Sequence, residues 1–396
     1  MLRVSHVLER CYTFRQRAVE EGCLDQEVLM SEYQYYEFQT IDHPLTREEQ
    51  ADISQLSSRV ALSPTRAIFT YQFGDFRGDP KKVLARYFDA MLYLANWGTK
   101  RLMFRFPKPL IDLKQVQPYC VEDMLSFSTV DKYVVLNLEI NDEERGFWVE
   151  GEGMLDSLIE LRGDILHGDH RSLYLAWLKV TEFENLETEE EPPVPPGLGK
   201  FSPALRDFVR LFEIDEHLIK VAAQASGHLE SSPDDKGALR QAIAQLDREE
   251  CDAYLLRLAQ GEPHLDMELV TRLRGFFGDT TRSKSGPRRK AKQLLRAADQ
   301  ERKAEEKRRA EEAEAKRVAE LEALFQRQKH TWQVIEELIR KSNSSAYREA
   351  AELLARLKQA AHLKGQEADF ETRLTELRVR YKTRHALMAG LREARL

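Results

Sequence analysis

The part of the chain after Pro287 contains no further proline, and its only glycines are Gly365 and Gly390. Residues 290–328 consist mainly of Ala, Glu, Lys and Arg, which all favour a helix. The middle of this stretch, AADQERKAEEKRRAEEAEAKR, has almost no bulky apolar residue and therefore no face to bury. It also lacks the sustained a/d heptad of a coiled-coil dimer. We therefore predict one long, charged spacer helix, preceded by a basic hinge, over residues 280–328.

Apolar residues return after this spacer with helical spacing. A break at Asn343 separates the segment around Trp332 from a second helix, and a third helix begins near Phe370. The small-residue pattern ahead of Leu354 resembles one helix of a tetratricopeptide-type hairpin, over about one repeat. We predict a helical hairpin module at 329–396 that contacts a partner through Trp332, Ile335, Tyr347, Leu354 and Phe370.

The first half of the chain mixes strands and helices without a repeated βαβ unit. Aromatic or β-branched strands are expected at 32–41, 60–73, 101–106 and 132–140. A short helix is expected at 1–28, and a second one is expected to begin at Asp79-Pro80 and to run as far as Gly98. These elements predict an α+β domain with a mostly antiparallel sheet at residues 1–181.

The composition changes abruptly after residue 181. Six glutamates between Glu182 and Glu191 precede the sequence PPVPP, which stiffens as polyproline II and has little to bury. Residues 182–200 are therefore predicted to be an acidic, proline-rich linker. A small all-α domain is expected at 201–279, opened by the capping pair Ser202-Pro203.

The basic hinge suggests an alternative function. Its cationic side chains have no acidic residue among them: Arg282, Lys284, Arg288, Arg289, Lys290, Lys292 and Arg296. Such a segment neutralises phosphates, so a nucleic-acid-associated accessory protein is one hypothesis. Interleaved aromatic side chains for base stacking are absent. The competing interpretations are a solvated hinge and a pairing of these cations with the acidic run at 182–191 of this chain.

A second alternative comes from a cluster of polar residues at 160–170. Asp164 and His167 share one helical face with Glu160, and a turn at Gly168 would bring Asp169 and His170 nearby. Carboxylates with imidazoles suit a divalent metal, so Asp164, His167 and His170 could form a hydrolase site. The competing interpretation is an ordinary polar junction between two helices, because the spacing matches no fixed metal motif.

Two segments, ANWGTKRLMFRFP at 95–107 and LRGDILHGDHRSLYLAWL at 161–178, resemble a family of bacterial proteins without an assigned activity. The resemblance implies a bacterial cytoplasmic origin and supplies no catalytic residues. Four dispersed cysteines without a CxxC pair also favour a reducing compartment. No apolar run is long enough to span a membrane. Our main hypothesis is a non-enzymatic, cytoplasmic adaptor without a cofactor, which binds a protein partner through its C-terminal helices; its oligomeric state stays open.

Overall fold

The computed structural model describes residues 32–143, 151–186, 188–227, 236–262, 265–274, 276 and 288–396. The helix expected at 1–28 lies outside these residues. The chain divides into two compact units, Met1–Glu301 and Arg302–Leu396. These are called the first unit and the C-terminal unit below.

The first unit is built on a seven-stranded sheet in the order β2-β3-β1-β4-β5-β7-β6, in which every neighbouring pair is antiparallel. The expected α+β architecture with an antiparallel sheet is therefore confirmed, and so are the four expected strand regions. The strands are β1 (Gln34–Gln39), β2 (Ala61–Leu62), β3 (Arg66–Tyr71), β4 (Ala90–Ala95), β5 (Thr99–Pro107), β6 (Leu125–Val130) and β7 (Tyr133–Asn141).

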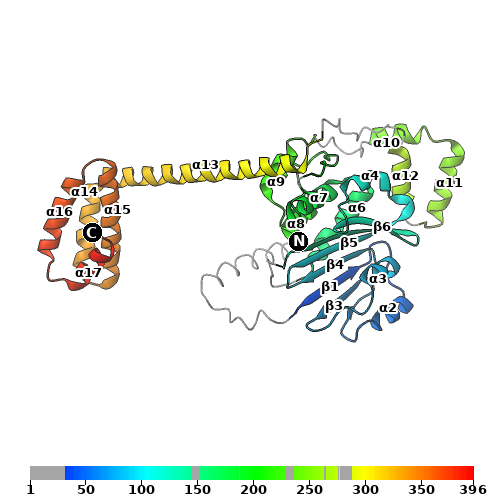
Figure 1. Ribbon diagram of the computed structural model, residues 1–396, viewed down its shortest axis with the longest axis horizontal. Coiled ribbons are helices and arrows are strands. Elements are labelled where there is room, and N and C mark those ends of the chain that lie inside the picture. The colour runs from blue at the N-terminus through cyan, green and yellow to red at the C-terminus, as the bar shows by residue number, and fades with distance from the viewer. Residues whose placement is uncertain are drawn as a thin grey trace. The chain divides into compact units, whose positions relative to one another are not determined.

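Helices lie on both faces of the sheet (Figure 1), and each face carries its own apolar core. Helices α2 (Arg47–Ser54) and α3 (Pro80–Tyr87) cover one face through Ile53 and Leu84, both fully buried. The other face packs against a helical layer that includes Trp177, 2% exposed. This layer contains α5 (Met154–Leu158), α6 (Glu160–Leu166), α7 (Arg171–Phe183), α8 (Pro203–Phe212) and α9 (Glu216–Ala223), with α4 (Leu113–Val116) near the sheet edge.

The prediction of one helix from Asp79-Pro80 to Gly98 is wrong over its second half. Helix α3 ends at Tyr87, and the following AMLYLA forms β4, which lies between β1 and β5. Both faces of this central strand are covered, so it is apolar throughout, and periodicity cannot distinguish it from a buried helix. Gly98 instead lies in the turn before β5 with φ of 106°, where a Cβ would come within 1.9 Å of the Asp142 carbonyl oxygen.

The predicted linker at 182–200 is also wrong, because much of it belongs to the core of the first unit. Glu191 is 3% exposed, Leu198 is 2% exposed, and the Tyr119 hydroxyl donates to the Pro193 carbonyl at 2.8 Å. Leu198 shares one core with Phe208 of α8 and with the sheet. The start of the expected all-α domain at 201–279 is therefore continuous with the first domain. The remaining helices of this unit are α10 (Lys236–Ile243), α11 (Arg248–Ala259) and α12 (Leu265–Arg274).

The predicted long helix is present as α13 (Ala291–Gln326). Its first turns place Ala291, Leu294 and Ala298 in the core of the first unit, whereas Leu321 is buried in the C-terminal unit. Between these ends, no side chain at 301–320 is buried. The expected spacer helix without an apolar seam is confirmed.

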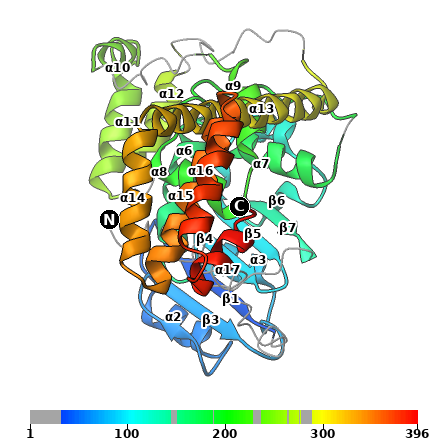
Figure 2. The ribbon, with the colours of Figure 1, turned by 90° about the vertical axis from the view of Figure 1, so that its left-hand side faces the viewer.

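The C-terminal unit is a bundle rather than a simple hairpin. Four helices follow α13 and pack alongside one another (Figure 2). They are α14 (Gln328–Arg340), α15 (Ser344–Leu363), α16 (Glu367–Arg380) and α17 (His385–Glu393). The sequence prediction missed α17, whose Leu387 and Leu391 complete the core beside α15.

Candidate functional site

The polar cluster at 160–170 does not form the predicted metal site. The Nδ1 atom of His167 lies 2.7 Å from the Gly163 carbonyl oxygen, and the carboxylate of Asp169 binds the Arg171 guanidinium at 2.6 Å. His170 packs against the ring of Tyr119, and burial lowers the pKa of its imidazole. Burial and nearby Asp169 raise the pKa of Asp164. Among the described residues, no group of three or more His, Cys, Asp or Glu side chains could hold a metal ion. The junction interpretation therefore fits the structure better.

A buried ion network, which sequence reasoning missed, lies at one end of the sheet. Asp89 follows α3 and is 0% exposed; its Oδ1 atom accepts from Arg105 on β5 at 2.7 Å. Arg162 on α6 donates two hydrogen bonds of 2.8 Å to Asp42 and lies 3.6 Å from Asp89. Two cations thus balance two carboxylates, and the network joins both layers of helices to the sheet. The charges of the four side chains cancel, and each side chain has an ion-pair partner within the network. This arrangement indicates a structural role.

The most enzyme-like cluster lies on the face of β1 that packs against α5 and the other helices of that layer. Glu37 is fully buried, and its carboxylate accepts from Tyr35 at 2.9 Å and from Gln39 at 2.8 Å. Arg66 lies 3.1 Å from Glu37 and also pairs with Asp156, which is half exposed. Burial raises the pKa of Glu37 above its ordinary value. A buried carboxylate with a raised pKa is a common feature of active sites, but ion-pair networks produce it as well.

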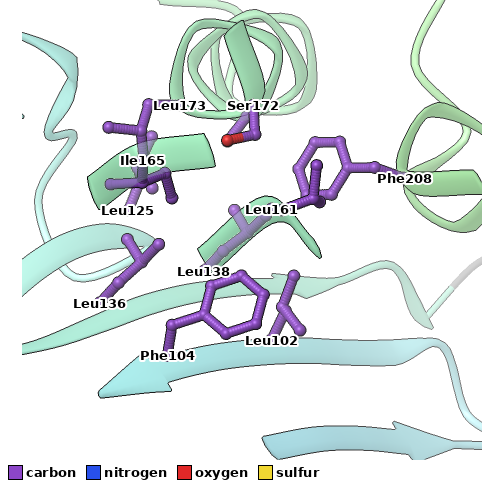
Figure 3. Close-up of a pocket in the computed structure, with 11 residues that line it drawn as sticks. Leu102, Phe104, Leu125, Leu136, Leu138, Leu161, Ile165, Ser172, Leu173 and Phe208 are labelled. Atoms are coloured by element: carbon purple, nitrogen blue, oxygen red, sulfur yellow. The ribbon is translucent and has the colours of Figure 1, made fainter. Parts of the chain in front are cut away.

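An internal cavity lies between the sheet and α7, and its volume is about 10 Å³ (Figure 3). That is room for about one water molecule, whereas small-molecule sites usually offer about 300 Å³ or more. Its walls are apolar apart from Ser172, which comes from α7. Within the described part of the chain, the buried Ser172 hydroxyl has no hydrogen-bond partner. This cavity therefore offers no substrate pocket.

The orphaned hydroxyl leads to a stability prediction. We expect Ser172→Ala to raise the free energy of unfolding by up to about 1 kcal/mol, because the substitution breaks no hydrogen bond to a described protein group and places an apolar side chain in an apolar lining. The matched control is Ser202→Ala. Ser202 caps α8 by accepting from the Leu205 amide at 3.2 Å, so the same substitution there should cost about 1 kcal/mol. Equal signs for the two variants in chemical denaturation would contradict the assignment.

One cation of the basic segment, Arg289, is paired with a carboxylate of the first unit. Arg289 binds Glu191 through two hydrogen bonds of 2.8 and 2.7 Å, and Tyr174 donates to the same carboxylate at 2.5 Å. Backbone hydrogen bonds also join residues 189–191 to residues 289–291. This clasp fixes the start of α13 to the first unit. The acidic run of the same chain, one of the partners considered for these cations, therefore holds Arg289.

The rest of the basic segment divides into two groups. Arg282 and Lys284 lie outside the described residues. Arg288, Lys290 and Arg296 are exposed, and Lys292 is half-buried. With Arg289 withdrawn into the clasp, the region retains fewer cations for phosphate contacts than the sequence suggested. Because Arg289 is paired with Glu191, the nucleic-acid hypothesis has less support than it had from the sequence alone.

Most residues predicted to contact a partner form the core of the C-terminal unit instead. Ile335 and Leu354 are 0% exposed, Phe370 is 4% exposed and Tyr347 is 9% exposed. Trp332 is half-buried beside the Phe370 ring, under the guanidinium of Arg373. The apolar helical pattern was correct, but it serves internal packing, as such a pattern usually does.

The surface that remains for contacts includes a basic end of the bundle. Here α14 ends, α15 begins and α16 turns into α17. Arg384 ties these elements together by donating to Ser342 at 2.7 Å and to the Tyr347 hydroxyl at 2.9 Å. We call this surface the basic end; its cationic residues are Arg340, Lys341, Arg348, Arg380, Lys382 and Arg384.

Half of the basic end is free for a partner. Glu336 lies between Arg340 and Arg380, at 3.6 and 3.1 Å, and neutralises part of their charge. Lys341, Arg348 and Lys382 are exposed, and no carboxylate of the described chain forms an ion pair with them. Exposed, unpaired cations on a rigid helical frame are suited to an acidic surface.

Comparison with protein-family models, curated proteins and solved structures finds no match to this chain. A search of the described helices finds none with the length and apolar character needed to cross a membrane.

Proposed function

We propose that the protein is a non-catalytic adaptor whose C-terminal unit binds an acidic protein surface through the basic end. The supporting observation is the set of exposed, unpaired cations Lys341, Arg348 and Lys382 on a unit that has its own apolar core. Because that core already uses the apolar side chains, the partner meets a charged surface. Such contacts set partner choice and association rate more than raw affinity.

The distribution of charge along the chain supports this proposal. Residues 302–396 carry 22 Lys and Arg against 16 Asp and Glu, although the whole chain has a net charge of -7. Residues 1–301 therefore hold the acidic excess, with 38 basic against 51 acidic side chains. A cationic unit in an otherwise acidic protein favours negatively charged partners.

The testing experiment compares two full-length variants as bait in pull-downs from the native host. The first, Lys341→Glu with Arg348→Glu and Lys382→Glu, reverses the free cations of the basic end. The second, Lys329→Glu with Arg356→Glu and Lys364→Glu, makes the same charge change elsewhere on the C-terminal unit. We expect the first variant to lose at least tenfold in affinity for the purified partner, a loss of about 1.4 kcal/mol or more.

The second variant should keep wild-type affinity for that partner. Higher salt should also weaken wild-type binding, since exposed charges are screened beyond about 8 Å at physiological ionic strength. Equal retention of the partner by both variants would contradict the proposal. Binding of duplex DNA by the wild type, lost only in the first variant, would instead assign the basic end to nucleic acid.

A further inference from the structure

The first turn of α15, within the basic end, carries two hydroxyl groups that the fold does not use. Ser344 and Ser345 are exposed, and within the described chain their hydroxyl groups form no hydrogen bond. They are not needed as a helix cap, because Asn343 caps α15 by accepting from the Ala346 amide at 2.7 Å. A serine oxygen that is neither buried nor bonded is accessible to a modifying enzyme.

Two cations precede these serines in the sequence. Arg340 and Lys341 lie four and three residues before Ser344, and every residue from Arg340 to Ser345 is exposed. Protein kinases select their substrates partly by such charge patterns, and an acidic substrate groove favours cations ahead of the serine. Ser344 therefore fits a kinase of this kind better than Ser345, which lies one residue farther from both cations.

The same surface provides charges that would hold a phosphate on Ser344. Arg348 lies four residues after Ser344, which places the two side chains on one face of α15. Arg348 is exposed and has no ion-pair partner among the described residues, and the same is true of Lys341 at the end of α14. A phosphate in the first turn of a helix also interacts favourably with the helix dipole.

The nearest carboxylates of α14 and α15 do not oppose this arrangement. Glu336 of α14 is paired with Arg340 and Arg380, at 3.6 and 3.1 Å. Glu349 lies five residues after Ser344, about 140° around α15, and therefore projects from another side of the helix. The charges that remain for a phosphate on Ser344 are therefore the unpaired cations.

We propose that Ser344 is a phosphorylation site, and that phosphate on it prevents the basic end from binding its acidic partner. The second part of this inference rests on the proposed function, whereas the first part does not. In the transfer, the Ser344 Oγ atom bonds to the γ-phosphorus of ATP, and the bond from this phosphorus to the oxygen that bridges to the β-phosphate breaks. ADP leaves, and the hydroxyl proton passes to the catalytic carboxylate of the kinase.

The effect on the partner follows from the change in charge. A phosphoserine carries a charge of about −1.5 to −2 at pH 7. The free cations of the basic end are Lys341, Arg348 and Lys382, so one phosphate cancels at least half of their charge. It also occupies Arg348 through charge-assisted hydrogen bonds, which the partner then loses. An acidic surface meets like charge at this point, and its affinity falls.

The first test combines the full-length protein with ATP and the catalytic domain of a kinase that prefers basic substrates. Mass spectrometry follows the phosphate at each serine. We expect phosphate at Ser344 to appear at least about tenfold faster than at Ser345, and Arg340→Gln with Lys341→Gln to slow it by a similar factor. No phosphate at Ser344, or a rate that is independent of these two cations, would overturn the assignment.

The second test introduces Ser344→phosphoserine during synthesis of the full chain and measures the second pKa of the phosphate by phosphorus NMR. The neighbouring cations should hold this pKa below its ordinary value of about 6, and Arg348→Gln should raise it again. The control is Ser54→phosphoserine, at the exposed last residue of α2, where the helix dipole disfavours an anion and should keep the pKa at or above that value. Equal pKa values at the two positions would overturn the proposed contacts.

The third test compares the binding of these proteins to the purified acidic partner. We expect Ser344→phosphoserine to lower the affinity at least tenfold, a loss of about 1.4 kcal/mol or more, and Ser54→phosphoserine to leave it unchanged. Equal affinities of the wild type and the Ser344 variant would overturn the regulatory role. A wild type that binds no acidic protein would contradict the proposed function instead, and the first two tests would still decide whether Ser344 takes and holds a phosphate.

Discussion

Replacing Asp89 with asparagine should lower the free energy of unfolding of the first unit by about 3–5 kcal/mol. Asp89 is fully buried and accepts from Arg105, while its second oxygen accepts from the backbone amides of Ile41 and Asp42. Among the described residues, the substitution leaves buried Arg105 and Arg162 with Asp42 as their one remaining carboxylate. An uncompensated buried charge is costly, and this cost dominates the expected loss.

The network also predicts a dependence on pH. Burial alone would raise the pKa of Asp89, but Arg105, Arg162 and the two backbone amides hold it below its ordinary value. A carboxylate with a lowered folded-state pKa contributes its full stability above the unfolded pKa of about 3.9. That contribution is lost as the pH falls through the folded pKa. Asp89→Asn should therefore show a shallower loss of stability below about pH 4 than the wild type.

The control for this prediction is Asp156→Asn. Asp156 also pairs with an arginine, Arg66, but its side chain is 49% exposed. Exposed ion pairs contribute only about 0–1 kcal/mol, so this variant should lose less than about 1 kcal/mol. Urea denaturation of both variants, followed by the tryptophan fluorescence of the protein, to which buried Trp177 contributes, checks the comparison. A loss at Asp89 no larger than that at Asp156 would show that the network does not hold the sheet and helices together.

The second large effect is expected in the C-terminal unit. Leu354→Ala should cost about 2–5 kcal/mol, because Leu354 is fully buried at the centre of the bundle and its removal leaves a cavity. The two units have separate cores, so the loss should be confined to one of them. Hydrogen exchange of the full chain should show faster exchange in α14–α17, with β4 and β5 unchanged.

Leu363→Ala provides the control within the same helix. Leu363 is the last residue of α15 and is 45% exposed, so its truncation should cost no more than about 0.5 kcal/mol. Faster exchange in the sheet of the Leu354 variant would mean that the C-terminal unit does not fold independently of the first unit.

The sequence predicted the elements whose pattern is set locally. The strands at 34–39 and 133–141 follow from their alternating or β-branched residues, and the long exposed helix α13 follows from its lack of an apolar face. The prediction was wrong where contacts between residues far apart in the sequence determine the secondary structure. Residues 90–95 are apolar because both faces of this strand are covered by apolar cores, and no local signal distinguishes such a strand from a buried helix.

Candidate sites were harder to predict, because a single residue's role depends on distant partners. Arg289 and Glu191 are 98 residues apart; the sequence suggested the two charged segments as partners, but only the fold shows which side chains pair. Ile335 and Leu354 have the same apolar spacing whether they face a partner or their own bundle. The side chains of the basic end come from two helix connections that are far apart in the sequence, so no continuous motif predicts it.

The central claim, that the basic end binds an acidic protein, is tested most directly by site-specific photocrosslinking in the native host. A photoreactive residue would replace Val379, which is 65% exposed in α16 between Arg378 and Arg380. The same residue at Phe73, 81% exposed in the first unit, is the control. We predict one discrete protein adduct at position 379 that disappears when Lys341, Arg348 and Lys382 are changed to glutamate. No adduct at 379, or an adduct that persists after this charge reversal, would contradict the account.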